Sequence, residues 1–334
     1  MSLRIEGDAD TTVLNVSGIE PGIRIRGLSA EAAPGFLGQG PRIEAWAARK
    51  RRIVCEIAQP DGQAELTASP KAAKYTTSDG SVWLESDRAA RVATDPSFSE
   101  PVFTGPRSLA TAVAQQWARL GAVTLHAAAV QIQGVHILLL GRKGTGKSTA
   151  CLSAIAAGGK VVSDDWLLAH LAQDKQPRIV SLRRKLLIRN GAAARTLLSK
   201  IPEVRTRRLS DRPKEILEEA SRYSTPEMHG IDALLVLQRP RAARPTQSAI
   251  QACPPNQAFS AMISAATPLF YSRSYPHERC QLVTIASRML SARSFHAVLG
   301  ADLCADPAYF WVKLAGQIHR KKGRHFADPL ASRP

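Results

Sequence analysis

The chain has 334 residues and a formal net charge of +17, from 45 Lys and Arg against 28 Asp and Glu. At this length it can bury a sizeable core and divide into two domains, and no apolar run approaches the ~18–20 residues of a membrane span. Its five cysteines are scattered and odd in number, and the first residues lack the basic and apolar regions of a signal peptide. We therefore expect a cytoplasmic protein with reduced thiols and no membrane association.

Residues 1–105 are predicted to form a small β-rich domain to which no chemistry can be assigned. Short runs of alternating apolar residues are separated there by Gly, Pro, Asp and Ser, as in a domain of short strands. The expected strands are residues 12–16, 23–25, 42–46, 53–57 and 82–85. Residues 107–120 carry apolar residues at helical spacing and predict a linking helix. The predicted division is an N-terminal domain over 1–105, a catalytic domain over 106–325 and a tail over 326–334.

A strand, a glycine-rich loop and a helix follow one another in mid-chain. Residues 123–132 and 135–140 predict a hairpin that turns at Gln133 and Gly134. The second strand leads into a complete G-x-x-x-x-G-K-[ST] motif and its helix, so we expect a nucleotide-binding segment. Its residues are Gly141, Arg142, Lys143, Gly144, Thr145, Gly146, Lys147, Ser148 and Thr149.

Each part of this motif has a physical reason. The glycines let successive N–H groups converge on one anion, and the helix directs its positive end at the same point. We expect Lys147 on a solvent-facing loop, reaching the β- and γ-phosphates of ATP, with the Ser148 hydroxyl on Mg²⁺. The alternative is a glycine-rich turn with a chance lysine.

Two carboxylates, Asp164 and Asp165, follow the next strand. The helix predicted over 147–157 ends at Gly158 and Gly159, and the strand over 160–163 returns parallel to the first. The carboxylates should therefore lie at the same sheet edge as the loop, where α/β sheets bind ligands. Such a pair can hold a metal ion and accept a proton from an attacking hydroxyl. The alternative is a cap for the following segment.

The stretch LHAAAVQIQGVHILLLGRKGTGKST, followed by GGKVVSDD, resembles the catalytic core of the HPr kinase/phosphorylase family over about residues 122–168. The order and spacing of His126, the glycine-rich loop and the Asp pair all fit that family. The resemblance implies an α/β P-loop kinase core of the HPr kinase type. By the same resemblance, Lys147 and Ser148 serve phosphate and metal, and Asp164 and Asp165 serve metal and general base. His126, which alone would more often be a structural residue, would line the same site.

The activity that this resemblance implies is transfer of the γ-phosphoryl group of ATP, with Mg²⁺, to a Ser hydroxyl of a protein or peptide. The family tends to form symmetric oligomers, which leaves a homo-oligomer open. A second family signature, which supplies an arginine, has no convincing copy here, because LLIRNG with Arg189 is a poor stand-in. The resemblance therefore implies neither phosphorylase activity nor HPr as the substrate. The alternative functions are a nucleic-acid-associated or regulatory P-loop ATPase and a nucleotide sensor without turnover.

Basic residues cluster in residues 175–214, 49–52 and 320–324. Such clusters attract nucleic acid through its phosphates, or they form a solvated surface that favours an acidic substrate. Without interleaved aromatics or a binding-module signature, the second interpretation is favoured. A buried strand is predicted from Gly230 to before Pro240. Helices are predicted over 258–266, 281–290 and 309–319, and residues 204–221 as a mobile loop or a surface linker.

Overall fold

The protein is mixed α/β, with several sheets and few helices. The computed structural model describes residues 3–7, 11–16, 19–26, 52–57, 73–76, 82–85, 89–93, 117–118, 120–182, 186–189, 191–208, 214–217, 220–240, 245–266 and 276–320. The predicted strand over 42–46 and most of the predicted helix over 107–120 lie outside them. None of the helices within these ranges is long and apolar enough to cross a membrane.

The chain forms two compact units. Met1–Leu125, Leu168–Lys175 and Ala266–Ile285 make up the first unit. His126–Leu167, Gln176–Ala265 and Ala286–Pro334 make up the second. The domain limits drawn from the sequence, at residues 105 and 325, stay predictions.

The first unit contains a seven-stranded antiparallel sheet of order β1-β2-β3-β4-β7-β6-β5. Its strands are β1 (Leu3–Gly7), β2 (Thr11–Val16), β3 (Ile19–Arg26), β4 (Arg52–Ile57), β5 (Ala73–Thr76), β6 (Val82–Glu85) and β7 (Ala89–Ala93). Leu14 and Ile23 are fully buried, as the alternating pattern requires. The strands predicted at 12–16, 23–25, 53–57 and 82–85 are confirmed.

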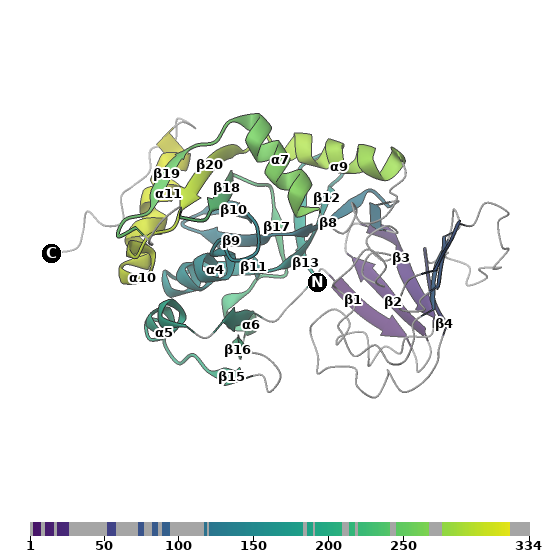
Figure 1. Ribbon diagram of the computed structural model, residues 1–334, viewed down its shortest axis with the longest axis horizontal. Coiled ribbons are helices and arrows are strands. Elements are labelled where there is room, and N and C mark those ends of the chain that lie inside the picture. Colours follow the sequence, from purple (N-terminus) through teal and green to yellow (C-terminus); the bar gives the residue numbers. More distant parts are fainter. Residues whose placement is uncertain are drawn as a thin grey trace. The chain divides into compact units, whose positions relative to one another are not determined.

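The second unit is organised around a six-stranded sheet of order β11-β9-β10-β18-β20-β19 (Figure 1). Its strands are β9 (Ala128–Ile132), β10 (Val135–Leu140), β11 (Lys160–Ser163), β18 (Ala233–Gln238), β19 (Ala249–Ala252) and β20 (Arg293–Val298). The middle strands β10, β18 and β20 are parallel to one another, and the remaining pairs are antiparallel. The strand predicted to end before Pro240 is confirmed as β18.

The predicted hairpin is present, but the segment predicted as its first strand forms two separate strands. Gln133 and Gly134 both have positive φ, as a two-residue hairpin turn needs, and Val135 pairs with Ile132. Residues 123–132, however, divide at the fully buried Ala127 into β8 (Ala122–His126) and β9. β9 joins the six-stranded sheet, whereas β8 ends the sheet β17-β13-β12-β8. The apolar sequence on both sides of Ala127 hides this change of partner, because both strands are buried.

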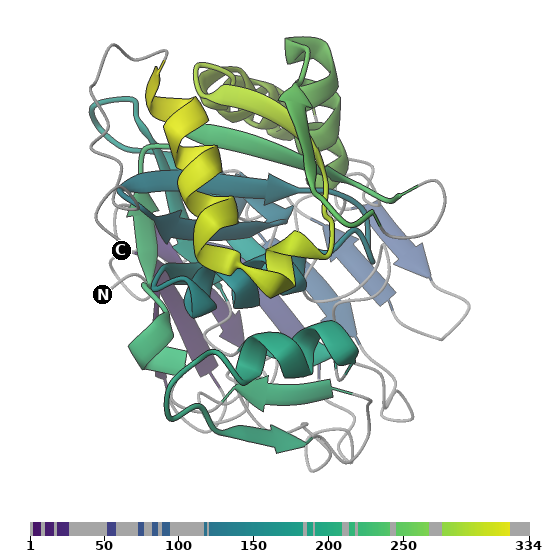
Figure 2. The same ribbon diagram turned by 90° about the vertical axis from the view of Figure 1, so that its left-hand side faces the viewer.

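Helices cover both faces of the six-stranded sheet. Helix α4 (Lys147–Ala156) packs on one face with α5 (Ala192–Leu198), α10 (Asp302–Ala305) and α11 (Pro307–Arg320), sharing one apolar cluster with Ile137 and Leu139 (Figure 2, with α11 in yellow). Helix α7 (Pro255–Ala265) packs on the other face against β10, β18 and β20. The predicted helices over 258–266, 281–290 and 309–319 correspond to α7, α9 (Pro276–Met289) and α11.

Helix α4 is fixed at its end and along its side. It ends as predicted at Gly158, whose φ is +82°, and the amides of Gly158 and Gly159 donate to the carbonyls of Ile155 and Ala154. This is the Schellman pattern. In its middle, the buried Ser153 hydroxyl donates to Leu303 O and accepts from Trp311 Nε1 at 3.1 Å. These bonds hold α4, and the loop before it, at one position on the sheet.

Smaller elements complete the described part of the chain. The four-stranded sheet contains β8, β12 (Trp166–Leu171), β13 (Pro177–Ser181) and β17 (Glu227–His229). A three-stranded sheet contains β14 (Leu187–Arg189), β15 (Thr206–Arg208) and β16 (Lys214–Leu217), with the short α6 (Ala220–Tyr223) after it. The sequence predicts a mobile loop or a surface linker over residues 204–221, and both are wrong for the described residues there, which include two antiparallel strands. The charges of this segment and Pro213 obscured the short strands.

Candidate active site

The glycine-rich loop and the acidic pair meet at one edge of the six-stranded sheet. Both β10 and β11 are antiparallel to β9, which lies between them, so β10 and β11 run in the same direction. Ala129 of β9 is level with Leu138 on one side and with Ser163 on the other. Asp164 and Asp165 therefore leave β11 close to the level at which Gly141 leaves β10. The predicted placement of the pair at the edge of the loop is confirmed.

The backbone of the loop needs glycine at three positions. Gly141, Gly144 and Gly146 have φ values of +147°, +84° and +103°, a region that side chains disfavour. A Cβ on Gly141 would stand 2.6 Å from Thr145 Oγ1 and 2.8 Å from Leu237 O. The loop is thus a tight turn against β18, closed by the Thr145 hydroxyl, which donates to Arg142 O.

The helix that follows offers amide groups to an anion. Gly146 is its N-cap, no side chain bonds there, and the first turn of α4 carries no acidic residue. The first helical N–H groups, including those of Ser148 and Thr149, have no partners within a helix and point out of its positive end. This is the arrangement in which proteins bind phosphate groups. The strand–loop–helix context argues against a chance turn.

Lys147 is buried, with 7% of its surface exposed, so the prediction of a solvent-facing lysine is wrong. Its ammonium donates to Gly141 O at 2.7 Å and to Arg142 O at 3.4 Å. Burial lowers the pKa of Lys147, while the charges of Asp165, Cys151 and Asp164 act in the opposite direction. The lysine is covered because the loop wraps around the start of α4, a property that the motif does not display.

Asp164 and Asp165 have different surroundings. Asp164 is 5% exposed. Burial raises the pKa of the Cys151 thiol, and the negative charge of Asp164 raises it further. The Asp165 side chain is 28% exposed, and its Oδ1 lies 2.8 Å from Nε2 of His126. The following element is strand β12 and not a helix, so the alternative of a helix cap is excluded.

His126 is brought to the acidic pair, as the sequence predicted. It is the last residue of β8, its side chain is 35% exposed, and its ring stacks on Trp166 with centroids 6.1 Å apart. The stacking and the hydrogen bond to Asp165 together fix the imidazole between an aromatic ring and a carboxylate. Its catalytic role stays a prediction.

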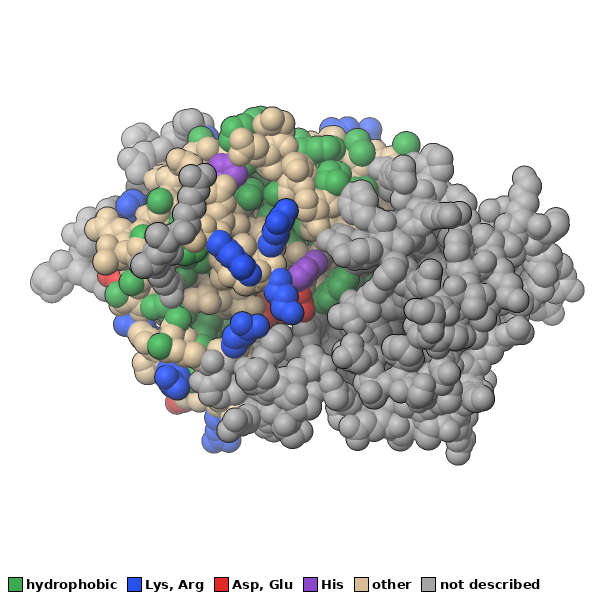
Figure 3. Space-filling model, in the orientation of Figure 1, with side chains coloured by type: hydrophobic (Ala, Val, Ile, Leu, Met, Phe, Trp, Pro, Cys, Tyr) green, Lys and Arg blue, Asp and Glu red, His purple; other side chains and the backbone are tan. Residues whose placement is uncertain are grey.

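A residue that the sequence analysis did not single out reaches the loop from the other side. Nη2 of Arg239, the residue directly after β18, donates to Lys143 O at 2.7 Å. Figure 3 shows Lys and Arg side chains gathered on this face around a His and an acidic side chain. The sequence predicts the strand that ends before Pro240, but only its parallel pairing with β10 shows that it ends at the loop.

The described residues offer the types of group that would bind ATP and Mg²⁺. Among them no group of three or more His, Cys, Asp or Glu could form a cage for a metal ion. Mg²⁺ beside a nucleotide is commonly held by one or two protein ligands together with phosphates. The Ser148 hydroxyl and Asp164 are of the right chemistry, and the loop supplies the amides and the lysine.

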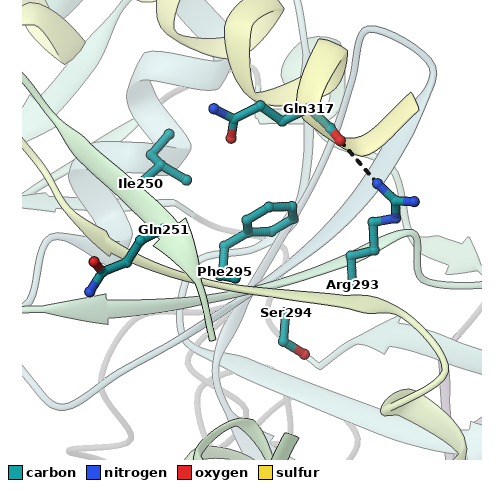
Figure 4. A pocket seen from close by; sticks show the side chains of 7 residues that line it. Ile250, Gln251, Arg293, Ser294, Phe295 and Gln317 are labelled. Atoms are coloured by element: carbon teal, nitrogen blue, oxygen red, sulfur yellow. Dashed lines mark hydrogen bonds between the residues drawn. The ribbon is translucent and has the colours of Figure 1, made fainter. Parts of the chain in front are cut away.

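A cavity of the second unit lies away from this edge. It has a volume of ≈ 530 Å³ and is lined by residues of β19, β20 and α11, with Arg293 donating to Gln317 O (Figure 4). None of its lining residues belongs to the loop or the acidic pair. Arg293 starts β20, at the end of the parallel strands opposite to the loop.

The fold and the loop thus define a mixed α/β protein with a strand–loop–helix segment of the phosphate-binding kind. No protein-family model and no curated protein matches the chain. Among solved structures, the chain is similar to the HPr(Ser) kinase/phosphatase from Coxiella burnetii. The identity is 12% and the TM-score 0.31, over 60% of this chain and 99% of that one. The chemistry of the site therefore rests on its own residues.

Proposed function

We propose that the protein is an ATP-dependent phosphotransferase that moves the γ-phosphoryl group to a hydroxyl, a Ser of a protein or peptide. The observation that carries this proposal is the His126–Asp165 pair beside Lys147 at the edge of the glycine-rich loop. A site that only binds nucleotide needs the loop alone. A site that transfers the phosphoryl group to a hydroxyl also needs an acceptor for the hydroxyl proton.

In the proposed reaction, Asp165 accepts the proton of the acceptor hydroxyl. The hydroxyl oxygen forms a bond to the γ-phosphorus, and the bond from that phosphorus to the β–γ bridging oxygen breaks, so ADP leaves with the electron pair. His126 donates its Nε2–H to Asp165 Oδ1 and so orients the carboxylate toward the acceptor. The Asp165 side chain is 28% exposed, so the carboxyl group then loses the proton directly to solvent.

Lys147 and the loop amides bind the phosphates and compensate their charge as the bond breaks. Because its ammonium is already buried and bonded to the carbonyl groups of Gly141 and Arg142, little reorganisation is needed when phosphate binds. Ser148 and Asp164 would hold Mg²⁺, which when bound neutralises charge on the β- and γ-phosphates.

The acceptor is proposed from the sequence resemblance together with the charge of the protein. The net charge of +17 and the exposed Arg142 and Lys143 suit an acidic protein or peptide. Several residues of the basic cluster over 175–214, among them Arg183, Arg184 and Lys185, lie outside the described part of the chain. A cytoplasmic location and a homo-oligomer stay predictions.

The test is transfer from ATP labelled in the γ-position to cell extract, with purified protein and Mg²⁺. We expect label on Ser in one or a few proteins or peptides, lost in Asp165→Asn and kept in Asp174→Asn, a matched change at an exposed carboxylate of the β12–β13 turn. ATP turnover that responds to DNA or RNA and labels no acceptor would instead favour the P-loop ATPase. ATP binding without any turnover would favour the sensor.

A further inference from the structure

Two strand ends, those of β11 and β18, lie on either side of the glycine-rich loop, and only β11 carries the acidic pair. β18 lies on the opposite side of β10 from β9 and β11, parallel to β10, with Val236 level with Leu140. The residues that extend β18 therefore run beside the residues that extend β10 into the loop. Leu237 lies against Gly141, and Arg239 lies against Lys143 and Gly144.

The Arg239 guanidinium lies directly on the loop. A Cβ built on Gly144 would stand 2.6 Å from Nη2 and 3.4 Å from Cζ of Arg239. The positive φ of Gly144 thus favours glycine, and a side chain there would also make the flexible end of Arg239 move aside. Among the described residues, the guanidinium has one hydrogen-bond partner, Lys143 O, at 2.7 Å. A guanidinium has five N–H donors, so further donors remain for an anion.

Side-chain hydrogen bonds hold the end of β18, directly before Arg239. The Gln238 amide donates to Nδ1 of His296 at 2.9 Å, and Nε2 of His296 donates to Oε1 of Gln257 at 2.6 Å. His296 is 7% exposed, whereas Gln238 and Gln257 are exposed, so a buried imidazole joins two side chains at the surface. The backbone at Arg239 therefore starts from a braced position, while its side chain is exposed and can exchange partners.

We infer that Arg239 is the γ-phosphate-binding arginine of this site and that it exchanges the Lys143 carbonyl for the transferring phosphoryl group when ATP binds. This inference rests on the proposed function. It adds to that function a positively charged residue on the side of the loop away from Asp165. A planar guanidinium suits phosphate oxygens because its paired donors match their spacing. In the step written above, negative charge develops on oxygens of the γ-phosphoryl group and of leaving ADP, and Arg239 stabilises that charge.

The experiment compares ADP with a non-hydrolysable ATP analogue, both in Mg²⁺, by equilibrium titration on the full-length protein. Arg239→Ala should weaken binding of the analogue about tenfold or more, the order expected for a lost charged contact of ~1.5–3 kcal/mol, and should leave ADP binding within about twofold. The kcat of the same variant should fall by about 10²–10³-fold, as for the loss of one charge-stabilising donor. Arg239→Lys keeps the charge but not the paired donors, so its affinity for the analogue and its kcat should lie between those of the wild type and of Arg239→Ala.

Arg195→Ala is the matched control, because it removes an exposed arginine from α5 and changes the net charge equally. Equal weakening of ADP and analogue in Arg239→Ala would show that the arginine only braces the loop through Lys143, and would overturn the inference. Unchanged binding and kcat would overturn it as well. Failure of the wild-type protein to bind either nucleotide would instead refute the proposed function, so the two failures can be told apart.

Discussion

The two sides of the glycine-rich loop are built in opposite ways. On the β11 side, Asp164 is buried and Asp165 is held by His126, which stacks on Trp166. On the β18 side, Arg239 is exposed and bonded to one backbone carbonyl. A fixed, partly buried group suits proton transfer, which depends on geometry. An exposed cation bonded to a replaceable backbone carbonyl suits an anion that arrives and leaves. In the proposed reaction, the first side therefore accepts the proton and the second side binds the phosphoryl group.

Substitution of Lys147, which lies between the two sides, should have the largest effect. Lys147→Met keeps much of the buried volume but removes the charge, and we expect a fall in turnover of about 10³-fold or more. Because Lys147 is buried and bonded to Gly141 O, some loss of stability should accompany it, and thermal unfolding measured beside kcat separates the two effects. Near-normal turnover would remove the loop from the mechanism.

Changes to the acidic pair should be next in size. Asp164→Asn and Asp165→Asn should each lower turnover by about 10²-fold or more. If Asp164 contacts the metal, higher Mg²⁺ should partly restore its variant. If Asp165 is the base, its variant should change the pH–rate profile and not respond to Mg²⁺. Wild-type rates in both variants would contradict the proposed roles.

His126→Ala should have a smaller effect, about 10-fold to 10²-fold on kcat, because the imidazole acts through Asp165. Turnover should fall more than stability, since the ring is exposed on one side. His136→Gln is a matched control on the opposite end of β10, where His136 Nδ1 lies 2.8 Å from His229 O. Equal effects of the two substitutions on kcat would show that His126 has no special part.

The smallest expected effect tests the position of Arg239 without any nucleotide. Gly144→Ala should destabilise the protein by slightly more than the ~1–2 kcal/mol that a left-handed alanine costs, because the exposed guanidinium at the Cβ position must move aside. When Arg239 is also replaced by Ala, Gly144→Ala should lower the stability only by the cost of the left-handed backbone. Chemical denaturation of the four proteins of this cycle measures the difference. Identical costs in both backgrounds would show that the guanidinium does not lie on Gly144.

The site was predictable on one side and not on the other, for a physical reason. The loop, the Schellman end at Gly158 and the return of β11 follow from local patterns, so Asp164 and Asp165 could be placed from sequence. The burial of Lys147 could not, because it depends on how the loop wraps the start of α4. Arg239 was missed because its position follows from the pairing of β10 with β18, and a lone arginine before Pro240 has no local signature. The exchange of sheets at Ala127 was hidden by continuous apolar sequence.

The distance along the chain between Lys143 and Arg239, 96 residues, has a consequence for how the molecule folds. The hairpin, α4 and β11 are consecutive, so the acidic side can close with short loops at a low entropic cost. The contact with Arg239 requires that β18 find β10 across the whole intervening segment, which is intrinsically slower. During synthesis, the loop and its carboxylates would leave the ribosome well before their arginine. A partly made chain would therefore possess the proton acceptor before it possesses the full complement of cations for ATP.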